Sequence, residues 1–307
     1  MSIRASIISF ILRQTIKKQF AEMADLDALR EDLGLTPAAP EELITQTIDA
    51  GGVKAEWVIW PGCADDSVLL YLHGGGYVFG GPNSHRDLVW RLAKGTGLKA
   101  LIVDYRLAPE HPFPAAVDDA TASYRWLLDQ GIDPDRIAIA GDSAGGGLAA
   151  ALMVNLKNLG VALPKAAVFI SPWADLTMSG KSMQTNVKAD AMLSPEAMDK
   201  FAAHYHGDTN PKAPLASPAF ADLSGFPPVL VVVGSTEILL SDSETLVEKI
   251  NATGGNARLT VWPKMFHVFP LMAARIPEGK QAVSDISAFL CDHLGTKIGR
   301  ASCRERV

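Results

Sequence analysis

The sequence predicts an α/β fold in which a mostly parallel β-sheet is covered by helices on both faces. Short apolar runs alternate with longer segments of helical periodicity along most of the chain, which is typical of parallel sheets with both faces buried. Two of these runs lead directly into glycine-rich turns. Because ligands bind at the carboxyl ends of the strands in open α/β sheets, we expect the functional residues there.

About eight strands are predicted, the first of them an antiparallel edge strand. In chain order they span residues 44–48, 56–60, 68–72, 100–103, 137–140, 167–170, 229–233 and 259–262. Helices are predicted where apolar residues recur at helical spacing. They span residues 86–94, 115–128, 145–159 and 242–252, and a last helix precedes the C-terminal tail.

Two stretches do not follow this alternation: the first forty residues, and residues 175 to about 227. A structureless loop as long as the second is uncommon in a compact domain, so we expect it to contain helices and to have a function. The two stretches together could cap the carboxyl ends of the strands; a decorative insertion is the alternative. The predicted organisation is cap helices in residues 1–45, the α/β domain in residues 46–174 and 226–297, and a cap insertion in residues 175–225.

The N-terminal segment is predicted to be an amphipathic helix packed on its own protein, rather than a helix on a membrane surface. Its apolar run is interrupted by Arg13, and no small-residue cleavage site follows, which argues against a secretory signal. No apolar stretch is long enough to span a bilayer, and the expected location is the cytoplasm. The apolar residues at roughly helical spacing are Ile3, Ile7, Phe10, Ile11, Ile16 and Phe20.

The composition is that of an ordinary globular protein with a sizeable core, since 48% of the 307 residues are apolar and 20% are charged. The formal net charge of -6 offers no basic surface for nucleic acid. Cys63, Cys291 and Cys303 are widely spaced, so free thiols are expected rather than a disulfide framework or a metal site. The final segment IGRASCRERV, residues 298–307, resembles a translated sequencing-library adapter and is predicted to be non-native.

The segment RIAIAGDSAGGGLAA, residues 136–150, carries the clearest catalytic signal. An apolar run ends at Gly141 and a helical pattern begins after Ser143, so residues 141–145 form G-x-S-x-G in a strand–turn–helix context. Such a turn is too tight for side chains at the glycine positions, which forces the serine hydroxyl outward. The following helix directs its positive end at the serine and would stabilise an oxyanion. Ser143 is therefore the predicted nucleophile.

A serine nucleophile needs a base, and in this arrangement the acid and then the histidine follow the serine along the chain. Four histidines lie beyond Ser143. His204 and His206 fall in the second irregular stretch, and His293 lies near the end of the last helical pattern. His267 lies in a loop directly after the last predicted strand, which makes it the predicted base.

The carboxylate that orients this base is expected just past the strand that ends at Gly234. Glu237 and Asp242 both follow it, and Glu237 is the closer of the two. Asp242 also suits the N-cap of the helix after it, which would explain that residue without catalysis. Glu237 is the favoured acid and Asp242 the alternative, since either carboxylate can hold the imidazole tautomer.

A second glycine-rich turn, in VLLYLHGGGYVFG, follows an apolar strand directly. Consecutive glycines leave backbone N–H groups bare for a substrate, as an oxyanion hole requires. A phosphate-binding loop would instead need a helix N-terminus and a lysine straight after the glycines, and neither is present in the sequence. His73, at the start of this turn, is interpreted as a structural residue that holds the loop by a hydrogen bond.

In order and spacing, these motifs resemble the hormone-sensitive-lipase-like (bacterial family IV) esterases of the α/β-hydrolase superfamily, from about residue 35 to residue 294. The resemblance rests on HGGG at residues 73–76, YRLAPEHPFPAAVDD at 105–119, GDSAG at 141–145 and SPWADLT at 171–177. It implies the α/β-hydrolase fold, with a helical cap built from the N-terminus and a mid-chain insertion.

The resemblance also implies roles for individual residues. It places the catalytic serine at Ser143 and the base at His267, and it forms the oxyanion hole from Gly75, Gly76 and the Ala144 amide. That family usually carries aspartate in a DPLxDE-like segment at the acid position, where this chain has EILLSD starting at residue 237. This departure leaves the identity of the acid between the two carboxylates named above.

The predicted function is a carboxylesterase that hydrolyses short- to medium-chain acyl esters through a serine acyl-enzyme. No metal or organic cofactor is expected. The alternatives are an amidase, lactonase or acyltransferase with the same triad, or a non-catalytic small-molecule receptor on the same fold, as the plant gibberellin receptors are. The expected partner is a small acyl ester, with a homodimer as an option, and neither nucleic acid nor a membrane is expected.

Overall fold

The computed structural model describes residues 1–22, 30 and 37–296. It contains an eight-stranded sheet in the order β1-β2-β4-β3-β5-β6-β7-β8. β2 pairs antiparallel with β1 and β4, and the other neighbours pair parallel. The predicted α/β fold with a mostly parallel sheet is confirmed. The strands are β1 Ile44–Asp49, β2 Lys54–Ile59, β3 Ala64–Leu72, β4 Leu98–Val103, β5 Ile137–Asp142, β6 Ala166–Ile170, β7 Val229–Gly234 and β8 Ala257–Trp262.

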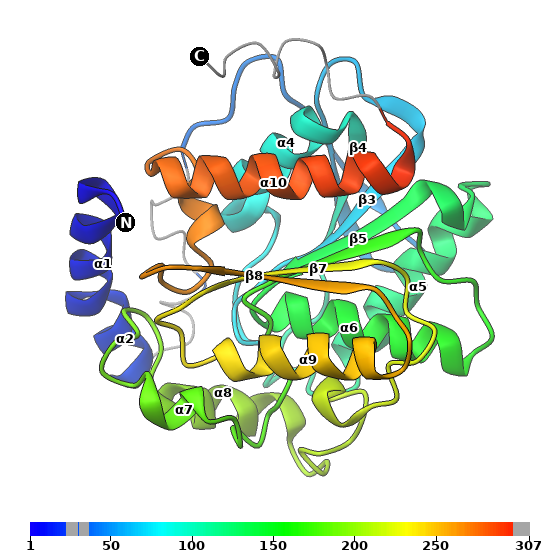
Figure 1. Ribbon diagram of the computed structural model, residues 1–307. Helices are drawn as coiled ribbons and strands as arrows, with labels where there is room; N and C mark the ends of the chain where they lie inside the picture. The colour runs from blue at the N-terminus through cyan, green and yellow to red at the C-terminus, as the bar shows by residue number, and fades with distance from the viewer. Residues whose placement is uncertain (23–29, 31–36, 297–307) are drawn as a thin grey trace.

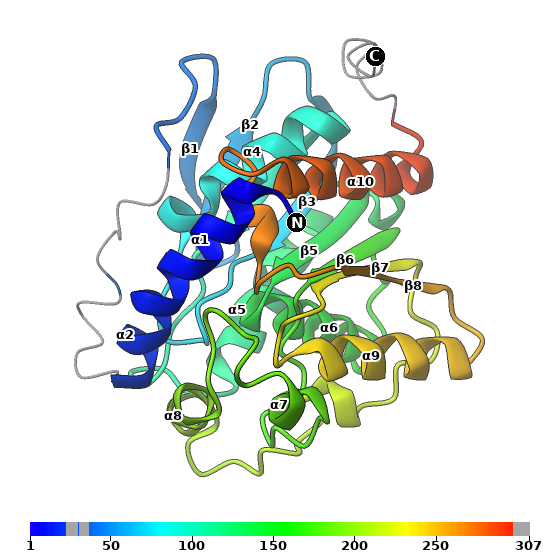
Figure 2. The same cartoon turned by 60° about the vertical axis from the view of Figure 1, so that its left-hand side comes forward.

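Helices cover both faces of the sheet. α4 and α10 pack together on one face, and α5, α6 and α9 lie on the other (Figure 1). Four further helices, α1, α2, α7 and α8, lie outside these two layers (Figure 2). The helices are α1 Ile3–Gln14, α2 Ile16–Glu22, α4 Pro82–Thr96, α5 Ala115–Asp129, α6 Ala144–Asn158, α7 Ser182–Thr185, α8 Pro195–His206, α9 Leu240–Ala252 and α10 Pro277–Leu294.

The apolar strands of the sequence are the central strands of the sheet. Every residue of β5, β6 and β7 is buried, as expected for parallel strands with helices on both faces. β8 lies at one edge of the sheet, and its side chains are only partly covered or exposed. The predicted antiparallel edge strand at residues 44–48 is confirmed as β1, which pairs with β2.

Local signals explain where several helices begin and end. α4 starts with Pro82 and ends at Gly97 in the left-handed conformation, and α10 likewise starts with Pro277 and ends at Gly295. Proline fits the first helical position because no intrahelical acceptor is available there, and glycine adopts the left-handed conformation without strain. α8 begins after Ser194, whose hydroxyl accepts from the Ala197 N–H. The second irregular stretch therefore contains a capped helix, as predicted.

The N-terminal helix differs from the prediction in two ways. It is broken into α1 and α2 at Thr15, and its buried apolar residues in α1 are Ala5 and Leu12. Four apolar residues predicted on the packed face are exposed by 50–81%: Ile3, Ile7, Phe10 and Ile11. Only Ile16 and Phe20 of the predicted set are buried.

Polar contacts explain which face of the N-terminal helices turns inward. Arg13 donates to the Ala189 carbonyl at 2.8 Å, and Lys17 donates to the Val187 and Asp190 carbonyls at 2.7 and 2.8 Å. These bonds tie the N-terminal helices to the loop between α7 and α8. The basic residues of the segment therefore bind the protein's own backbone. Residues 23–29 and 31–36 of the predicted N-terminal cap, the predicted tail 298–307 and Cys303 lie outside the described residues.

Candidate active site

Ser143 lies at the carboxyl end of β5, in the turn that leads into α6. Its φ of 53° is unusual for a residue with a side chain, and such strain is often held at functional sites. The turn is as tight as predicted: a Cβ on Gly141 would lie 2.2 Å from the Gly145 carbonyl oxygen, and one on Gly145 would lie 2.1 Å from that of Leu72. Glycine at both positions lets α6 start against β3, which holds the serine at the strand end.

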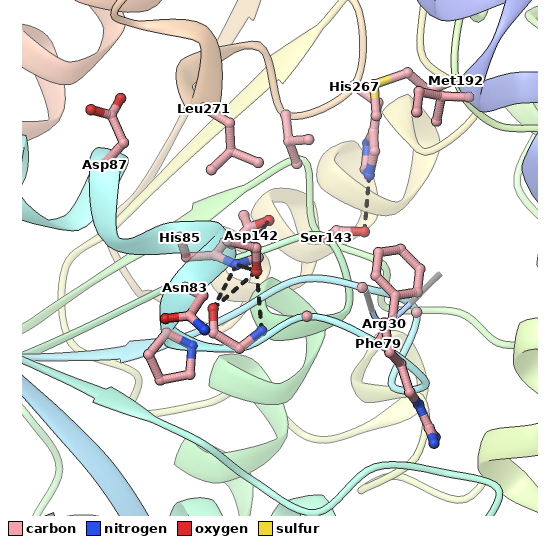
Figure 3. A pocket seen from close by; sticks show the side chains of 18 of the residues that line it. Arg30, Phe79, Asn83, His85, Asp87, Asp142, Ser143, Met192, His267 and Leu271 are labelled. Carbon is pink, nitrogen blue, oxygen red and sulfur yellow. Dashed lines mark hydrogen bonds and ion pairs between the residues drawn. The ribbon is translucent and has the colours of Figure 1, made fainter. Parts of the chain in front are cut away.

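The three residues predicted from strand order lie in one hydrogen-bonded chain. Ser143 Oγ is 2.9 Å from His267 Nε2, and His267 Nδ1 is 2.8 Å from Glu237 Oε2. A carboxylate only accepts, so Nδ1 carries the proton and Nε2 is free to accept from the serine hydroxyl. Figure 3 shows the His267 ring directed at the Ser143 hydroxyl, and both residues line one pocket. The arrangement can therefore take a proton from the serine.

The surroundings of His267 favour its charged form. Burial opposes the imidazolium, but the hydrogen bond and negative charge of Glu237, with smaller contributions from Asp190 and Asp142, outweigh it and raise the pKa of His267. The histidine follows β8 in a loop held by Thr236, whose hydroxyl donates to the Met265 carbonyl at 2.6 Å. The His267 imidazole can therefore accept a proton, and Glu237 would stabilise it once it has done so.

Glu237 is completely buried, and both of its carboxylate oxygens accept hydrogen bonds. Oε2 faces His267, while Oε1 accepts from the Gly234 N–H at 2.5 Å and from the Ser171 hydroxyl at 2.7 Å. A buried carboxylate needs such donors to stay charged. The side chain is therefore fixed in the orientation that an acid partner of the base requires.

Asp242 lies elsewhere, and its predicted role as an N-cap is wrong. The N-cap of α9 is Leu239, and Asp242 belongs to the first turn of that helix. Its Oδ2 accepts from the backbone N–H groups of Ala174 and Asp175 at 2.8 and 2.9 Å. Burial raises the pKa of Asp242 to about 7. The helix starts two residues earlier than the sequence pattern indicates, which turns the Asp242 side chain inward. There it holds the loop after β6.

The HGGG turn follows β3 and is braced from several sides. The Asp142 carboxylate accepts from the Gly74 N–H at 3.1 Å and from the Tyr71 hydroxyl at 2.8 Å. The Tyr105 hydroxyl donates to the His73 carbonyl at 2.7 Å, and the His73 and Tyr105 rings stack with centroids 4.1 Å apart. These contacts fix the backbone of the turn that contains the two predicted oxyanion glycines.

His73 is held inside the protein. Its Nδ1 lies 2.8 Å from the Gly74 carbonyl oxygen, and burial lowers the pKa of His73 to about 4. The ring is therefore neutral at neutral pH and bound to its own loop, in agreement with the structural role predicted for it. Asp142 is held as a carboxylate: burial opposes the charge, but His85 and the Tyr71 hydroxyl outweigh burial and lower the pKa of Asp142.

Of the predicted oxyanion donors, Ala144 adjoins Ser143 in the chain, and Gly75 and Gly76 line the same pocket as the serine. No hydrogen bond between described residues uses the N–H groups of Gly75 or Gly76, and φ is positive at both glycines. Ala144 is the first residue of α6, where a backbone N–H has no intrahelical acceptor. Ser143 and both glycines line the same pocket, so these donors are available to a ligand there.

The pocket at the serine has a volume of about 450 Å³. One end, near Ser143, is covered by the N-terminal helices and α8; its apolar lining includes Ile16, Phe20, Met198 and Phe201. The other end extends past Leu271 toward polar residues such as Asn83 and Asp87 (Figure 3). The site therefore combines an apolar chamber with a polar extension.

Sequence reasoning missed two groups of residues around the site. Ser171 contacts Glu237, and Asp142 with its partners Tyr71 and His85 braces the HGGG turn. A signal existed for Ser171: it directly follows β6, at the same edge of the sheet as Ser143 and Glu237. The contacts of Asp142 could not have been predicted in this way, because they join residues from three separate segments: β3 with the turn after it, α4 and the end of β5.

Other expectations bear on metals, thiols and membranes. Cys63 and Cys291 are free, as predicted. Within residues 1–22, 30 and 37–296, no group of three or more His, Cys, Asp or Glu residues could hold a metal ion. None of the helices in that part of the chain has the length and apolar character needed to cross a bilayer.

Comparison with known proteins places the chain among hydrolases. Residues 69–271 match the α/β hydrolase fold family. The chain is 44% identical over 264 residues to an acetyl-hydrolase of Streptomyces hygroscopicus, a match that covers 86% of this chain and 87% of that protein. It is 41% identical to the crystal structure of EstE5 soaked with p-nitrophenyl butyrate, with a TM-score of 0.92 over 96% of this chain and 100% of the other. An esterase from the bacterial hormone-sensitive lipase (HSL) family matches with 42% identity and a TM-score of 0.88, over 96% of this chain and 99% of the other.

Proposed function

This chain belongs to the α/β-hydrolase-fold family, among the esterases that resemble hormone-sensitive lipase, and we propose that it is a carboxylesterase acting through Ser143, His267 and Glu237. One observation carries the proposal. Distances of 2.9 Å and 2.8 Å join the serine hydroxyl, the imidazole and a buried carboxylate in one chain at a pocket. This is the arrangement that activates a serine for acyl transfer.

In the first step, His267 Nε2 accepts the hydroxyl proton while Ser143 Oγ attacks the ester carbonyl carbon. The carbonyl oxygen becomes an oxyanion, which Gly75, Gly76 and the Ala144 amide bind through their N–H groups. The tetrahedral intermediate then breaks its bond to the alcohol oxygen, and the imidazolium gives that oxygen the proton. The products are a free alcohol and an acyl-serine.

In the second step, water enters the place that the alcohol has left. His267 accepts one of its protons, and the hydroxide attacks the acyl carbon to form a second oxyanion. The bond to Ser143 Oγ breaks, and the serine recovers its proton from the imidazolium. Glu237 stabilises the imidazolium in both steps and stays charged itself. The carboxylic acid leaves, and no group beyond these side chains is consumed.

We further propose that residues 1–45 and 175–225 form a cap on a catalytic domain of residues 46–174 and 226–297. Support comes from the pocket, whose walls include Ile16 and Phe20 of α2 together with Met198 and Phe201 of α8. These apolar side chains suit a short- to medium-chain acyl group, since contact with a hydrocarbon chain removes apolar surface from water.

A series of p-nitrophenyl esters of increasing chain length tests the proposed function. We expect turnover with the acetate, butyrate and hexanoate, and a loss of roughly 10⁶-fold in kcat for Ser143→Ala. Ser287→Ala is a matched control, since that serine is buried in α10 and donates to the Val283 carbonyl at 2.8 Å. Retained activity in Ser143→Ala would refute the nucleophile assignment.

The same assay separates the alternatives. A receptor on this fold needs no base at hydrogen-bond distance from the serine, so the position of His267 favours an enzyme. Anilides and lactones of matched acyl length, and alcohol acceptors added to the ester assay, would reveal an amidase, a lactonase or an acyltransferase. A homodimer, a cytoplasmic location and the lack of a cofactor, of nucleic-acid binding and of membrane binding stay predictions.

A further inference from the structure

We propose that Ser171 is a positioning residue for the Glu237–His267 pair. Its one hydroxyl group fixes the place of the acid relative to the base. The inference rests on the proposed function, because it assigns Ser171 a part in the same reaction. Ser171 directly follows β6, which lies between the strand of the nucleophile, β5, and the strand of the acid, β7.

The hydroxyl of Ser171 makes two hydrogen bonds with opposite roles. It donates to Glu237 Oε1 at 2.7 Å and accepts from the backbone N–H of Val268 at 3.2 Å. Val268 is the residue after His267, and its φ of 47° is uncommon for a β-branched side chain. One hydroxyl therefore joins the acid directly to the loop that carries the base.

The backbone of Ser171 is held in a specific conformation. Its φ is 48°, and its N–H donates to the Val232 carbonyl at 2.7 Å. Its side chain is completely buried. A serine held in the left-handed region at the end of a central strand points its hydroxyl at the neighbouring strand end. Such strain persists only where the surrounding contacts fix it.

The bond to Glu237 matters because this chain uses a glutamate. Glutamate has one more rotatable bond than aspartate, so its carboxylate needs more support to keep one orientation. Ser171 and the Gly234 N–H both bind Oε1, and this leaves Oε2 for His267. Without the serine donor, Oε1 keeps only the Gly234 N–H. The carboxylate is then held less firmly, and its charge, less neutralised by hydrogen bonds, acts more strongly on the imidazolium that it faces.

The first test compares Ser171→Ala and Ser171→Gly with wild type in the p-nitrophenyl butyrate assay. Both variants remove the hydroxyl, and glycine also accepts the positive φ without strain, so it keeps the test valid if the alanine variant folds poorly. We expect kcat to fall about 10- to 100-fold, with KM changed by less than about threefold because Ser171 does not line the pocket. Ser287→Ala is the control for loss of a buried serine.

The acid limb of the kcat/KM pH profile separates a positioning role from a merely structural one. Removing a serine that only stabilises the fold would leave the midpoint of that limb unchanged. The carboxylates that act on His267 are Glu237, Asp190 and Asp142. With the Ser171 donor removed, the Glu237 charge is less neutralised, so we expect the acid limb of kcat/KM to move to higher pH. The low-field N–H proton of His267, followed by NMR in the resting protein, should show the same shift without any turnover.

A double-mutant cycle with Glu237→Gln decides whether Ser171 acts through the acid. If it does, Ser171→Ala lowers kcat much less in the Glu237→Gln background than in wild type, because the two changes break one unit. Equal losses in both backgrounds, or folded Ser171 variants with wild-type kcat and pH profile, would overturn the proposal. If the wild type hydrolyses no ester, the proposed function fails, while the NMR titration still decides whether Ser171 controls the His267–Glu237 pair.

Discussion

The ring of Phe201 lies directly on the backbone of Gly76: a Cβ added to that glycine would come within 2.9 Å of Phe201 Cγ. Phe201 belongs to α8, and Gly76 belongs to the HGGG turn after β3. The two segments also meet one residue after Gly76 and one helical turn after Phe201, since the Tyr77 and Tyr205 rings stack with centroids 3.6 Å apart. The helix over the pocket is therefore in contact with the predicted oxyanion donors, and changes on either side should affect both binding and rate.

Gly76→Ala should lower kcat by about 100- to 1,000-fold, the loss that removing one oxyanion donor produces. The new methyl group has no room beside Phe201, so the turn must shift away from the serine. Steady-state kinetics with p-nitrophenyl butyrate measures this effect. A double variant, Gly76→Ala with Phe201→Ala, frees the space and should recover part of the lost rate; no recovery would mean that the positive φ of residue 76, and not the ring, causes the loss.

Phe201→Ala alone should shift the preference toward longer acyl chains. The ring packs against Phe20 and Phe79, with centroids 5.7 and 5.9 Å away, and all three side chains line the pocket. Removing it lengthens the apolar chamber, so kcat/KM for the decanoate relative to the butyrate should rise roughly tenfold. Phe289→Ala, on α10 away from the pocket lining, is the control. An unchanged ratio would place the acyl group elsewhere.

Glu237→Ala should lower kcat by about 10³- to 10⁴-fold, because the imidazole loses the partner that fixes its tautomer and stabilises its charge. Asp242→Asn should keep kcat within about threefold of wild type, since its carboxylate binds the Ala174 and Asp175 amides and not His267. The ester assay with both variants distinguishes the two carboxylates. The reverse pattern would reassign the acid.

The parts of the site that were predicted share one property: each follows a strand directly. Ser143, Glu237 and His267 come after β5, β7 and β8 in that order. The order of strands and motifs therefore indicated the serine and the histidine, and it left Glu237 and Asp242 as candidates for the acid. Ser171 also follows a strand, but its contact with Glu237 depends on a positive φ, which no local pattern in the sequence indicates.

The buried face of α1 could not be chosen by periodicity alone. Apolar residues occur on two sides of that helix, with Leu12 on the buried side and Ile7 and Phe10 on the exposed side. Both stripes have helical spacing, and the choice depends on the carbonyls that Arg13 reaches in a loop 175 residues away. Long-range polar contacts of this kind lie beyond a single-sequence pattern.

The acid limb of kcat/KM should lie above the ordinary histidine pKa of about 6.5. Glu237 raises the pKa of His267, and only the neutral imidazole can take the serine proton. Activity should therefore be full at pH above the raised pKa and fall as the pH drops through it. A pH profile with p-nitrophenyl butyrate measures the midpoint. In Glu237→Gln the midpoint should move down, and a midpoint that stays in place would mean that the acid does not control the base.

Asp242 should make the free energy of unfolding fall as the pH rises from about 4 to about 7. Its pKa is about 7 in the folded protein and about 3.9 in an unfolded chain. Between these values the folded protein binds a proton that the unfolded chain lacks, so the stabilisation is complete below about pH 4 and is lost as the pH passes about 7. Asp242→Asn lacks this titration, yet its single amide oxygen can accept both backbone N–H groups, because Oδ2 alone accepts both of them in the wild type.

Urea unfolding of the wild type and Asp242→Asn at pH 4, 6 and 8 tests this difference. Relative to the wild type, the asparagine variant should gain roughly 1–3 kcal/mol between pH 4 and pH 8, and all other titrating groups cancel in the comparison. Asp242→Ala removes the acceptor of both amides and should be destabilised by roughly 2 kcal/mol or more at every pH. A difference between the wild type and Asp242→Asn that does not change with pH would mean that Asp242 is charged in the folded protein throughout this range, with its two backbone donors sufficient to offset its burial.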